Sequence, residues 1–258
     1  MVYLDGDNNL DPWAQYTVDL MVQGLAASNR GNVSVVVVWD HPGATGGEKG
    51  VVTASGYRKL ADVPEPDMSS GTTLAQFIGW AMRAYPAERY VLNMWDHGSG
   101  WVYLASDDTT EAAGTSPSGG RMLVADLATG IAAGEAAAGR RIDMVLFEMC
   151  NMGMVEVSYQ LRSLCGYVVA TELTQDFEGI PWNTTVRDLD LAPGMTTAAL
   201  GKIMVDQLVL SYQTDNKHAK AIATLSCIDQ TKQEELVRSM DGLSLALMAD
   251  MKHTGRAP

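Results

Sequence analysis

A histidine and a cysteine each follow a short apolar run, in positions where they could act together in nucleophilic catalysis. His97 comes just after the run 90–95, in the stretch Asp-His-Gly-Ser-Gly-Trp, and Cys150 comes just after the run 144–147, in Glu-Met-Cys-Asn-Met-Gly. The thiolate is the nucleophilic form of cysteine, and a nearby imidazolium or a helix N-terminus favours it. The pair therefore predicts acyl-transfer chemistry.

Small residues and backbone groups beside the pair fit the same chemistry. Gly98 and Gly100 let the backbone next to His97 approach a substrate closely. The N–H groups of Gly98 and Cys150 could form an oxyanion hole. A helix predicted from Gly153 would place its positive end close behind Cys150.

Each of these residues also has a simpler interpretation. A cysteine at a strand end is more often a buried small hydrophobic residue, and a lone histidine in a turn is more often a structural hydrogen-bonding group. Their joint placement favours catalysis, and Cys150 follows His97 by 53 residues, close to the spacing of about 50 seen in caspases. Cys165 and Cys227 are interpreted as core or partly buried thiols.

Continuous apolar runs predict the sheet that must position the pair. Runs without polar alternation are typical of strands covered on both faces; they are residues 2–4, 33–39, 90–95, 144–147, 167–171 and 221–225. Helices are predicted between them, at residues 10–27, 72–85, 122–138, 153–164, 194–212 and 230–250. This alternation predicts an α/β fold with a mostly parallel six-stranded central sheet and helices on both faces. Parallel neighbours would bring the imidazole and the thiol to one edge of the sheet.

Two segments interrupt the alternation. Residues 50–53 and 57–60, joined by Ala-Ser-Gly, predict a β-hairpin insert, and residues 103–121 predict a long exposed loop. No domain boundary is evident, so a single domain is expected over 1–258. Because the chain starts on the tail of a strand, it is expected to begin inside a fold.

Composition excludes several classes of protein. The 258 residues include 18 basic and 31 acidic side chains, a net charge of −13, and 47% are apolar. This charge argues against binding to nucleic acids or to anionic membranes, and it suits cationic partners. No apolar stretch is long enough to span a membrane, no signal peptide is recognisable at the start, and three cysteines do not form a disulfide framework.

Several motifs, in this order along the chain, resemble the clostripain-like cysteine peptidases, which are related to caspases, legumains and gingipains. The matching stretches are residues 3–10, 95–101, 143–156, 170–172 and 224–229. The resemblance implies a caspase-like three-layer sandwich, with His97 and Cys150 as a catalytic dyad. One departure is that the family usually has Asp-Ala-Cys where this chain has Glu148-Met149-Cys150. A second is that family members tend to extend past both of these termini, so the resemblance implies a chain trimmed at both ends.

The resemblance also implies cleavage after Arg or Lys, so the substrates would be polypeptides. A cationic side chain at P1, the substrate residue before the cleaved bond, needs a carboxylate in its pocket, S1. Glu148 is the first candidate, because a spacing of two places it on the same face of a strand as Cys150. Asp176 or Glu178 would form a second wall, although either could instead be a solvated loop charge.

Self-processing of a zymogen, between the histidine and the cysteine, is a further implication of the resemblance. Arg121 is the only basic residue from 101 to 139, and its surroundings are rich in Ser, Pro and Gly. Cleavage after Arg121 is therefore predicted, with Arg140 and Arg141 as weaker candidates. Alternatively, Arg121 merely opens the following helix.

No cofactor is expected to be required for the chemistry. Some relatives depend on calcium, but residues 5–16 fail the EF-hand pattern, with Leu10 at its sixth position and Tyr16 at its twelfth. Residues 7–9 are interpreted as turn and helix-capping residues. A calcium site among the acidic loops is conceivable, but the sequence does not locate one, and zinc motifs and a P-loop are absent.

Two other functions are compatible with parts of the sequence. A catalytically idle caspase-like module could bind basic peptides through the acidic pocket alone. A flavodoxin-like binder of a phosphorylated ligand is weaker, because no Gly-rich phosphate loop follows the first strand. The family resemblance suggests a secreted or cell-envelope protein.

Overall fold

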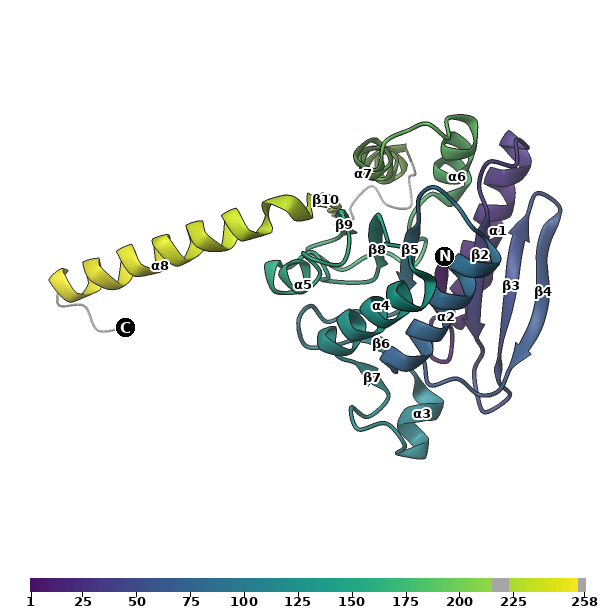
Figure 1. Ribbon diagram of the computed structural model, residues 1–258, viewed down its shortest axis with the longest axis horizontal. Coiled ribbons are helices and arrows are strands. Elements are labelled where there is room, and N and C mark those ends of the chain that lie inside the picture. Colours follow the sequence, from purple (N-terminus) through teal and green to yellow (C-terminus); the bar gives the residue numbers. More distant parts are fainter. Residues whose placement is uncertain (215–222, 255–258) are drawn as a thin grey trace.

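A single eight-stranded sheet forms the centre of the protein (Figure 1). The computed structural model describes residues 1–214 and 223–254. The strand order is β10-β9-β8-β5-β1-β2-β3-β4. The strands are β1 (Val2–Asp5), β2 (Val35–Asp40), β3 (Gly47–Thr53), β4 (Gly56–Val63), β5 (Val91–Trp95), β8 (Met144–Glu148), β9 (Tyr167–Ala170) and β10 (Ser226–Asp229).

The five inner strands, β9 to β2, are parallel, as the apolar runs predict. The predicted hairpin is present as β3 and β4, and it continues the sheet in antiparallel fashion beyond β2. The sheet is therefore wider than the six strands expected. The sixth predicted strand is wrong: residues 223–225 have no regular structure, residues 221–222 lie outside the described part, and β10 begins at Ser226, antiparallel to β9.

Helices cover both faces of the sheet and bury its alternating side chains in two cores. Val36 and Val38 point to the core under α2, α4 and α5, whereas Val35 and Val37 point to the core under α1, α6 and α7. The helices are α1 (Asp11–Ser28), α2 (Gly71–Ala84), α4 (Val124–Ala138), α5 (Val155–Gln160), α6 (Trp182–Leu191), α7 (Thr197–Thr214) and α8 (Gln233–Thr254). The three-layer α/β prediction is confirmed. Helix α8 extends away from the layers (Figure 1).

The segment predicted as a long loop, 103–121, is largely ordered into regular structure. It holds β6 (Leu104–Ser106), α3 (Asp108–Ala113) and the start of β7 (Arg121–Met122), which pairs with β6. Asp107 organises it, because its buried carboxylate accepts hydrogen bonds from the N–H groups of Thr110 and Met68. A helix of one or two turns with a polar sequence gives little apolar periodicity, so this element escaped prediction.

Helix α6 was also not predicted from the sequence. Its ten residues are mostly polar, but buried Trp182 and Val186 pack in the core with α1. Its last buried acid, Asp190, accepts hydrogen bonds from Ser28 and from the backbone of Asn32, which joins α6 to the turn before β2. Tertiary contacts rather than periodicity define this helix.

Candidate active site

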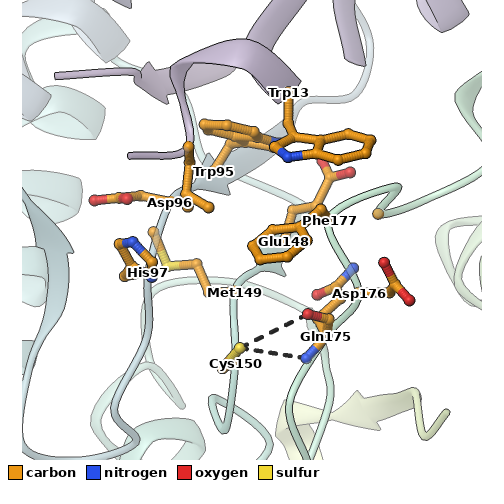
Figure 2. Close-up of a pocket in the computed structure, with 12 residues that line it drawn as sticks. Trp13, Trp95, Asp96, His97, Glu148, Met149, Cys150, Gln175, Asp176 and Phe177 are labelled. Atoms are coloured by element: carbon orange, nitrogen blue, oxygen red, sulfur yellow. Dashed lines mark hydrogen bonds between the residues drawn. The ribbon is translucent and has the colours of Figure 1, made fainter. Parts of the chain in front are cut away.

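His97 and Cys150 both lie at the carboxyl edge of the sheet, where they line one pocket (Figure 2). Strands β5 and β8 are parallel neighbours, with Trp95 opposite Glu148, so the residues that follow the two strands emerge side by side. The pocket encloses about 50 Å³. Its lining residues are Leu10, Trp13, Trp95, Asp96, His97, Glu148, Met149, Cys150, Gln175, Asp176, Phe177 and Gly179.

The imidazole of His97 is held by an asparagine from the loop after β1. Nε2 of His97 lies 2.8 Å from Oδ1 of Asn9. Because an amide oxygen only accepts, Nε2 carries the proton and Nδ1 is left to exchange one. Burial lowers the pKa of His97, and the nearby charge of Asp108 opposes this effect. The resting imidazole is therefore biased toward its neutral form.

Asn9 is one residue of this site that sequence reasoning missed, and Trp13 and Gln175, which line the pocket, are others. The stretch around Asn9 was interpreted as turn and helix-capping residues. Asn8 does form a turn, since its Oδ1 accepts the N–H of Leu10, but the capping prediction is wrong because Leu10 is the N-cap of α1 and no side chain of the described residues caps that helix. The Asn8 amide also binds the buried carboxylate of Asp96, next to His97. The sequence offered one indication that Asn9 belongs to the site: residues 3–10 are among the motifs that resemble the family.

The thiol of Cys150 lies against the segment between β9 and α6. Its Sγ accepts a hydrogen bond from the N–H of Gln175 at 3.3 Å and lies 3.9 Å from the carbonyl oxygen of Gln175 (Figure 2). Within the described residues, Cys150 and His97 do not hydrogen-bond to each other. Helix α5 begins at Val155 and is only six residues long, so the expected helix end lies further from Cys150 than predicted.

Backbone groups around the thiol are packed tightly. A Cβ added to Gly98 would lie 2.4 Å from the carbonyl oxygen of Cys150, so only glycine fits there. Across the described chain, the N–H groups of Gly98 and Cys150 donate to no other backbone or side-chain acceptor. Of the two residues, Cys150 lines the pocket and Gly98 does not.

Glu148 is a buried acid that lines the pocket. Only 5% of it is exposed, and its carboxylate accepts hydrogen bonds from Asn93 Nδ2, the N–H of Ile180 and Trp182 Nε1. Burial raises the pKa of Glu148 to about 6, and these donors limit the rise. All of these donors are neutral, so the ionised carboxylate carries an uncompensated negative charge at neutral pH.

The two acids proposed as a second wall are placed differently. Asp176 lines the pocket, whereas Glu178 lies in the same segment without lining it. Between them, exposed Phe177 stacks on Trp13 with ring centroids 5.6 Å apart. Burial raises the pKa of Tyr212, and the charges of Asp176, Glu178 and Cys150 add to the rise, so all three lie near this phenol.

The sequence predicted an open loop around Arg121, and this prediction is wrong. Arg121 belongs to β7 and pairs with Ser106 of β6. Its side chain is exposed, 3.9 Å from Glu111 and over the ring of Tyr103, and the following Met122 is fully buried. It also does not open the helix, since α4 begins at Val124.

Arg140 and Arg141 follow α4 on the surface. Arg140 binds the carbonyl oxygen of Ala87, and Arg141 pairs with Glu135 at 3.3 Å. Both belong to the short connection that leads from α4 into the start of β8. Cys150 follows the opposite end of that strand.

The remaining cysteines have the environments predicted for them. Cys165 is buried, which raises its pKa to about 12, and half-buried Cys227 has a pKa raised mainly by burial. All three cysteines are free. In the described part of the chain, no helix combines the length and the apolar character needed to cross a membrane.

Comparison with known proteins gives matches at the level of family and of structure. A model of the clostripain family of peptidases, C11, matches residues 2–257. A search of curated proteins found no match.

Three solved structures resemble the fold at low sequence identity. An inactive zymogen C11 protease from Parabacteroides distasonis superposes with a TM-score of 0.71 at 22% identity, covering 91% of this chain and 62% of that chain. A secreted C11 cysteine protease from Bacteroides thetaiotaomicron, with an irreversible peptide inhibitor, gives 0.74 at 20% identity, covering 91% and 66%. A second structure of a secreted C11 cysteine protease from Bacteroides thetaiotaomicron, "iotapain", superposes with a TM-score of 0.75 at 16% identity. The match covers 95% of this chain and 69% of that chain. The chain thus spans less than two thirds of the first two proteins.

Proposed function

The chain belongs to the clostripain family, and on that basis we propose that it is a cysteine endopeptidase that cleaves polypeptides after Arg or Lys. The observation that carries this proposal is the shared pocket: His97 and Cys150 come from separate strand ends and line one cavity with the buried acid Glu148.

The geometry supports a two-step acyl transfer. The Cys150 thiol passes its proton to Nδ1 of His97 and attacks the scissile carbonyl carbon as the thiolate. The oxyanion that forms accepts hydrogen bonds from the N–H groups of Gly98 and Cys150. His97, held through Nε2 by Asn9, gives a proton from Nδ1 to the leaving amine. The resulting thioester is hydrolysed by a water whose proton goes to Nδ1 of His97 and from there to the departing sulfur, which regenerates the Cys150 thiol and the neutral imidazole.

Specificity for a cationic P1 side chain follows from the charge of the pocket. Glu148 is ionised at neutral pH, buried, and satisfied only by neutral donors. Asp176 adds a second carboxylate to the lining. A guanidinium or ammonium group supplies the missing positive charge, and a neutral or acidic P1 side chain does not.

We further propose that self-processing occurs after Arg121. The side chain is exposed, but the bond lies in a paired strand beside buried Met122. Cleavage therefore requires the β6–β7 pair to open first, which makes self-processing slow compared with cleavage of an unstructured peptide.

The idle peptide-binding module is the second candidate. The observation that favours it is the absence of a hydrogen bond between His97 and Cys150 within the described residues, together with the attachment of the thiol to Gln175. A dyad that acts on a bound substrate does not require a direct hydrogen bond in the free enzyme. A measurement of substrate turnover therefore distinguishes the peptidase from the idle module.

Cleavage of matched fluorogenic peptides tests the proposal. The rate of cleavage of peptides that end in Arg, Lys or Asp is measured for the wild type and for Cys150→Ala. Each measurement is made with and without calcium. We expect Arg- and Lys-selective cleavage that Cys150→Ala abolishes. Iodoacetamide should modify Cys150 before Cys165 and Cys227, whose raised pKa values leave them as thiols.

Processing is followed on gels of the same samples. Arg121→Ala should remain intact, whereas Arg140→Ala and Arg141→Ala, the matched controls, should be cut like the wild type. A folded wild type that binds Arg peptides without cleaving them would support the idle module. Preference for Asp at P1 would contradict the assignment of the pocket.

A further inference from the structure

The pocket beside Cys150 is smaller in this structure than the side chain that it is proposed to hold. It encloses about 50 Å³, whereas a cavity that binds benzene measures about 150 Å³. The side chain of arginine has more non-hydrogen atoms than benzene, so part of the pocket wall must move when a substrate binds. We propose that residues 174–178 form a lid over S1, which a cationic P1 side chain opens. The identity of the opening ligand rests on the proposed function.

The walls of the pocket differ in how firmly the fold holds them. Trp95 and Glu148 are the last residues of β5 and β8, which pair in parallel in the middle of the sheet. Gln175, Asp176 and Phe177 lie instead in an irregular segment between β9 and α6. A segment outside the regular hydrogen bonding of strands opens at a lower free energy than a paired strand. The wall that moves is therefore this segment.

The two ends of the segment are attached to the fold by backbone hydrogen bonds. At its start, the carbonyl oxygen of Leu173 accepts the N–H of Asn151 at 2.9 Å. At its end, the N–H of Ile180 donates to the buried carboxylate of the pocket at 2.9 Å. Gly179 has a φ of 63°, and a Cβ at this position would overlap the same carboxylate. Residues 174–178 thus span the pocket between two fixed points.

Noncovalent contacts hold the middle of the segment over the pocket. The N–H of Gln175 donates to the nucleophilic sulfur at 3.3 Å (Figure 2). The ring of Phe177 stacks on Trp13, with centroids 5.6 Å apart and an interplanar angle of 14°. The backbone of Asp176 hydrogen-bonds to the phenol of Tyr212 on α7. Each contact of this kind contributes a modest free energy, so a ligand that binds the pocket can replace them.

The closed position leaves one buried polar group unsatisfied. Both amide atoms of the Gln175 side chain, Nε2 and Oε1, are buried without a hydrogen-bond partner among the described residues. Such a group destabilises the position that buries it. Gln175 lines the pocket, so after opening its Oε1 can accept from a guanidinium or ammonium group and its Nε2 can donate to a peptide carbonyl. Substrate binding thereby removes a penalty of the closed state.

The charge of the pocket explains why a cation opens the lid. Glu148 belongs to the fixed wall and Asp176 to the lid, and both line the pocket. A cationic side chain between them attracts both carboxylates, whereas a neutral side chain gains neither attraction. A ligand that binds only the open state shifts the population toward it. Opening also withdraws Gln175 from the sulfur, so occupation of S1 frees the nucleophile.

Alkylation of Cys150 tests the lid without an assay of catalysis. Benzamidine, whose amidinium resembles the end of an arginine side chain, is the probe of S1, and benzamide is its neutral control. Modification by iodoacetamide is followed by mass spectrometry at about pH 9.5, above the usual thiol pKa of about 8.5, so that the rate reports access to the sulfur. We expect saturating benzamidine to raise the rate at Cys150 about threefold or more, and benzamide to leave it unchanged.

One variant and a matched control locate the lid. Phe177→Ala removes the stack on Trp13, so in the absence of ligand Cys150 should be alkylated about threefold or more faster than in the wild type, and benzamidine should add little. Leu173→Ala changes an exposed apolar side chain next to the lid and outside the pocket lining. This control should behave like the wild type, and circular dichroism checks that both variants are folded.

Hydrogen exchange provides a second measurement. The backbone amides at 174–178 should exchange faster in the presence of benzamidine, whereas a ligand that enters a preformed pocket would slow their exchange. An unchanged or lower alkylation rate with benzamidine in the wild type, an unchanged rate in ligand-free Phe177→Ala, or slower exchange at 174–178 would each overturn the lid. None of these measurements requires turnover. A lid that opens in a protein that cleaves no peptide would therefore contradict the proposed peptidase function alone, and cleavage of Arg peptides without opening would contradict the lid alone.

Discussion

At the scale of single residues, the site depends on how neighbours bias protonation. His97 is pushed toward its neutral form by burial, while Asn9 fixes which nitrogen carries the proton. Glu148 is pushed toward its protonated form by burial, although three neutral donors oppose this. Both effects act close to physiological pH, so they are open to measurement.

The charge of Glu148 should make selection of P1 dependent on pH. Its pKa of about 6 means that the carboxylate is lost as the pH falls below 6. We expect the ratio of kcat/KM for an Arg peptide to that for the uncharged isostere citrulline to fall about tenfold from pH 7.5 to pH 5. His97 affects both peptides equally, so it cancels in the ratio. A ratio that does not change with pH would exclude Glu148 as the selecting charge.

Asn9 should act as a positioning residue for His97. Asn9→Ala removes the acceptor for Nε2, so we expect kcat to fall about 10- to 100-fold. Asn9→Asp keeps the acceptor and should restore most of kcat, but its charge favours the imidazolium, so the limb of the pH profile that reports His97 should move to higher pH. Wild-type kcat and an unshifted profile in both variants would show that the contact has no catalytic role.

At the scale of elements, irregular segments connect the sheet to its helices. The loop after β1 meets β5, β6 and α3 around Asn8 and Asp7, and the turn before β2 meets the end of α6 around Asp190. In each case a buried polar side chain forms hydrogen bonds with backbone groups that lie outside the regular hydrogen bonding of helices and strands. Such contacts fix the position of elements whose own sequence is weakly periodic.

Replacement of Asp190 should show how much one such contact contributes to stability. Burial raises the pKa of Asp190, but hydrogen bonds from Ser28, Arg30, Asn32 and Val33 outweigh it and lower the pKa. Asp190→Asn should reduce the free energy of unfolding by about 2–3 kcal/mol at pH 7, measured by urea denaturation. Because the folded state favours the ionised form, this difference should shrink as the pH falls below about 4.

Exposed Asp206 on α7 provides the control. It pairs with Lys202 on the helix surface, and Asp206→Asn should cost less than about 0.5 kcal/mol. Equal losses in the two variants would argue against a special role for Asp190.

At the scale of the whole molecule, the net charge of −13 should attract cationic substrates. Such attraction acts over about 10 Å at 0.1 M salt and is screened as ionic strength rises. For an Arg peptide with additional Lys residues, kcat/KM should fall about three- to tenfold from about 0.05 to 0.5 M NaCl, while kcat changes little. The same peptide with Glu in place of Lys is the control, and an equal salt response for both would contradict long-range attraction.

The sequence by itself determined the layers and the two residues at their edge. Continuous apolar runs such as 33–39 and 144–147 bury side chains on both faces, which allows only a covered, mostly parallel sheet. Parallel strands then require that His97 and Cys150 emerge at one edge. These properties follow from local pattern, so no tertiary information was needed.

Only the tertiary structure decided which partners those residues have. Three contacts join segments that are distant in sequence: Asn9 with His97, Gln175 with Cys150, and the strand of Arg121 with β6. A polar residue in a loop has no periodicity, and its role depends on which other loop packs against it. The physical reason is that hydrogen bonds and charges act over a few ångströms in space, whatever the separation along the chain.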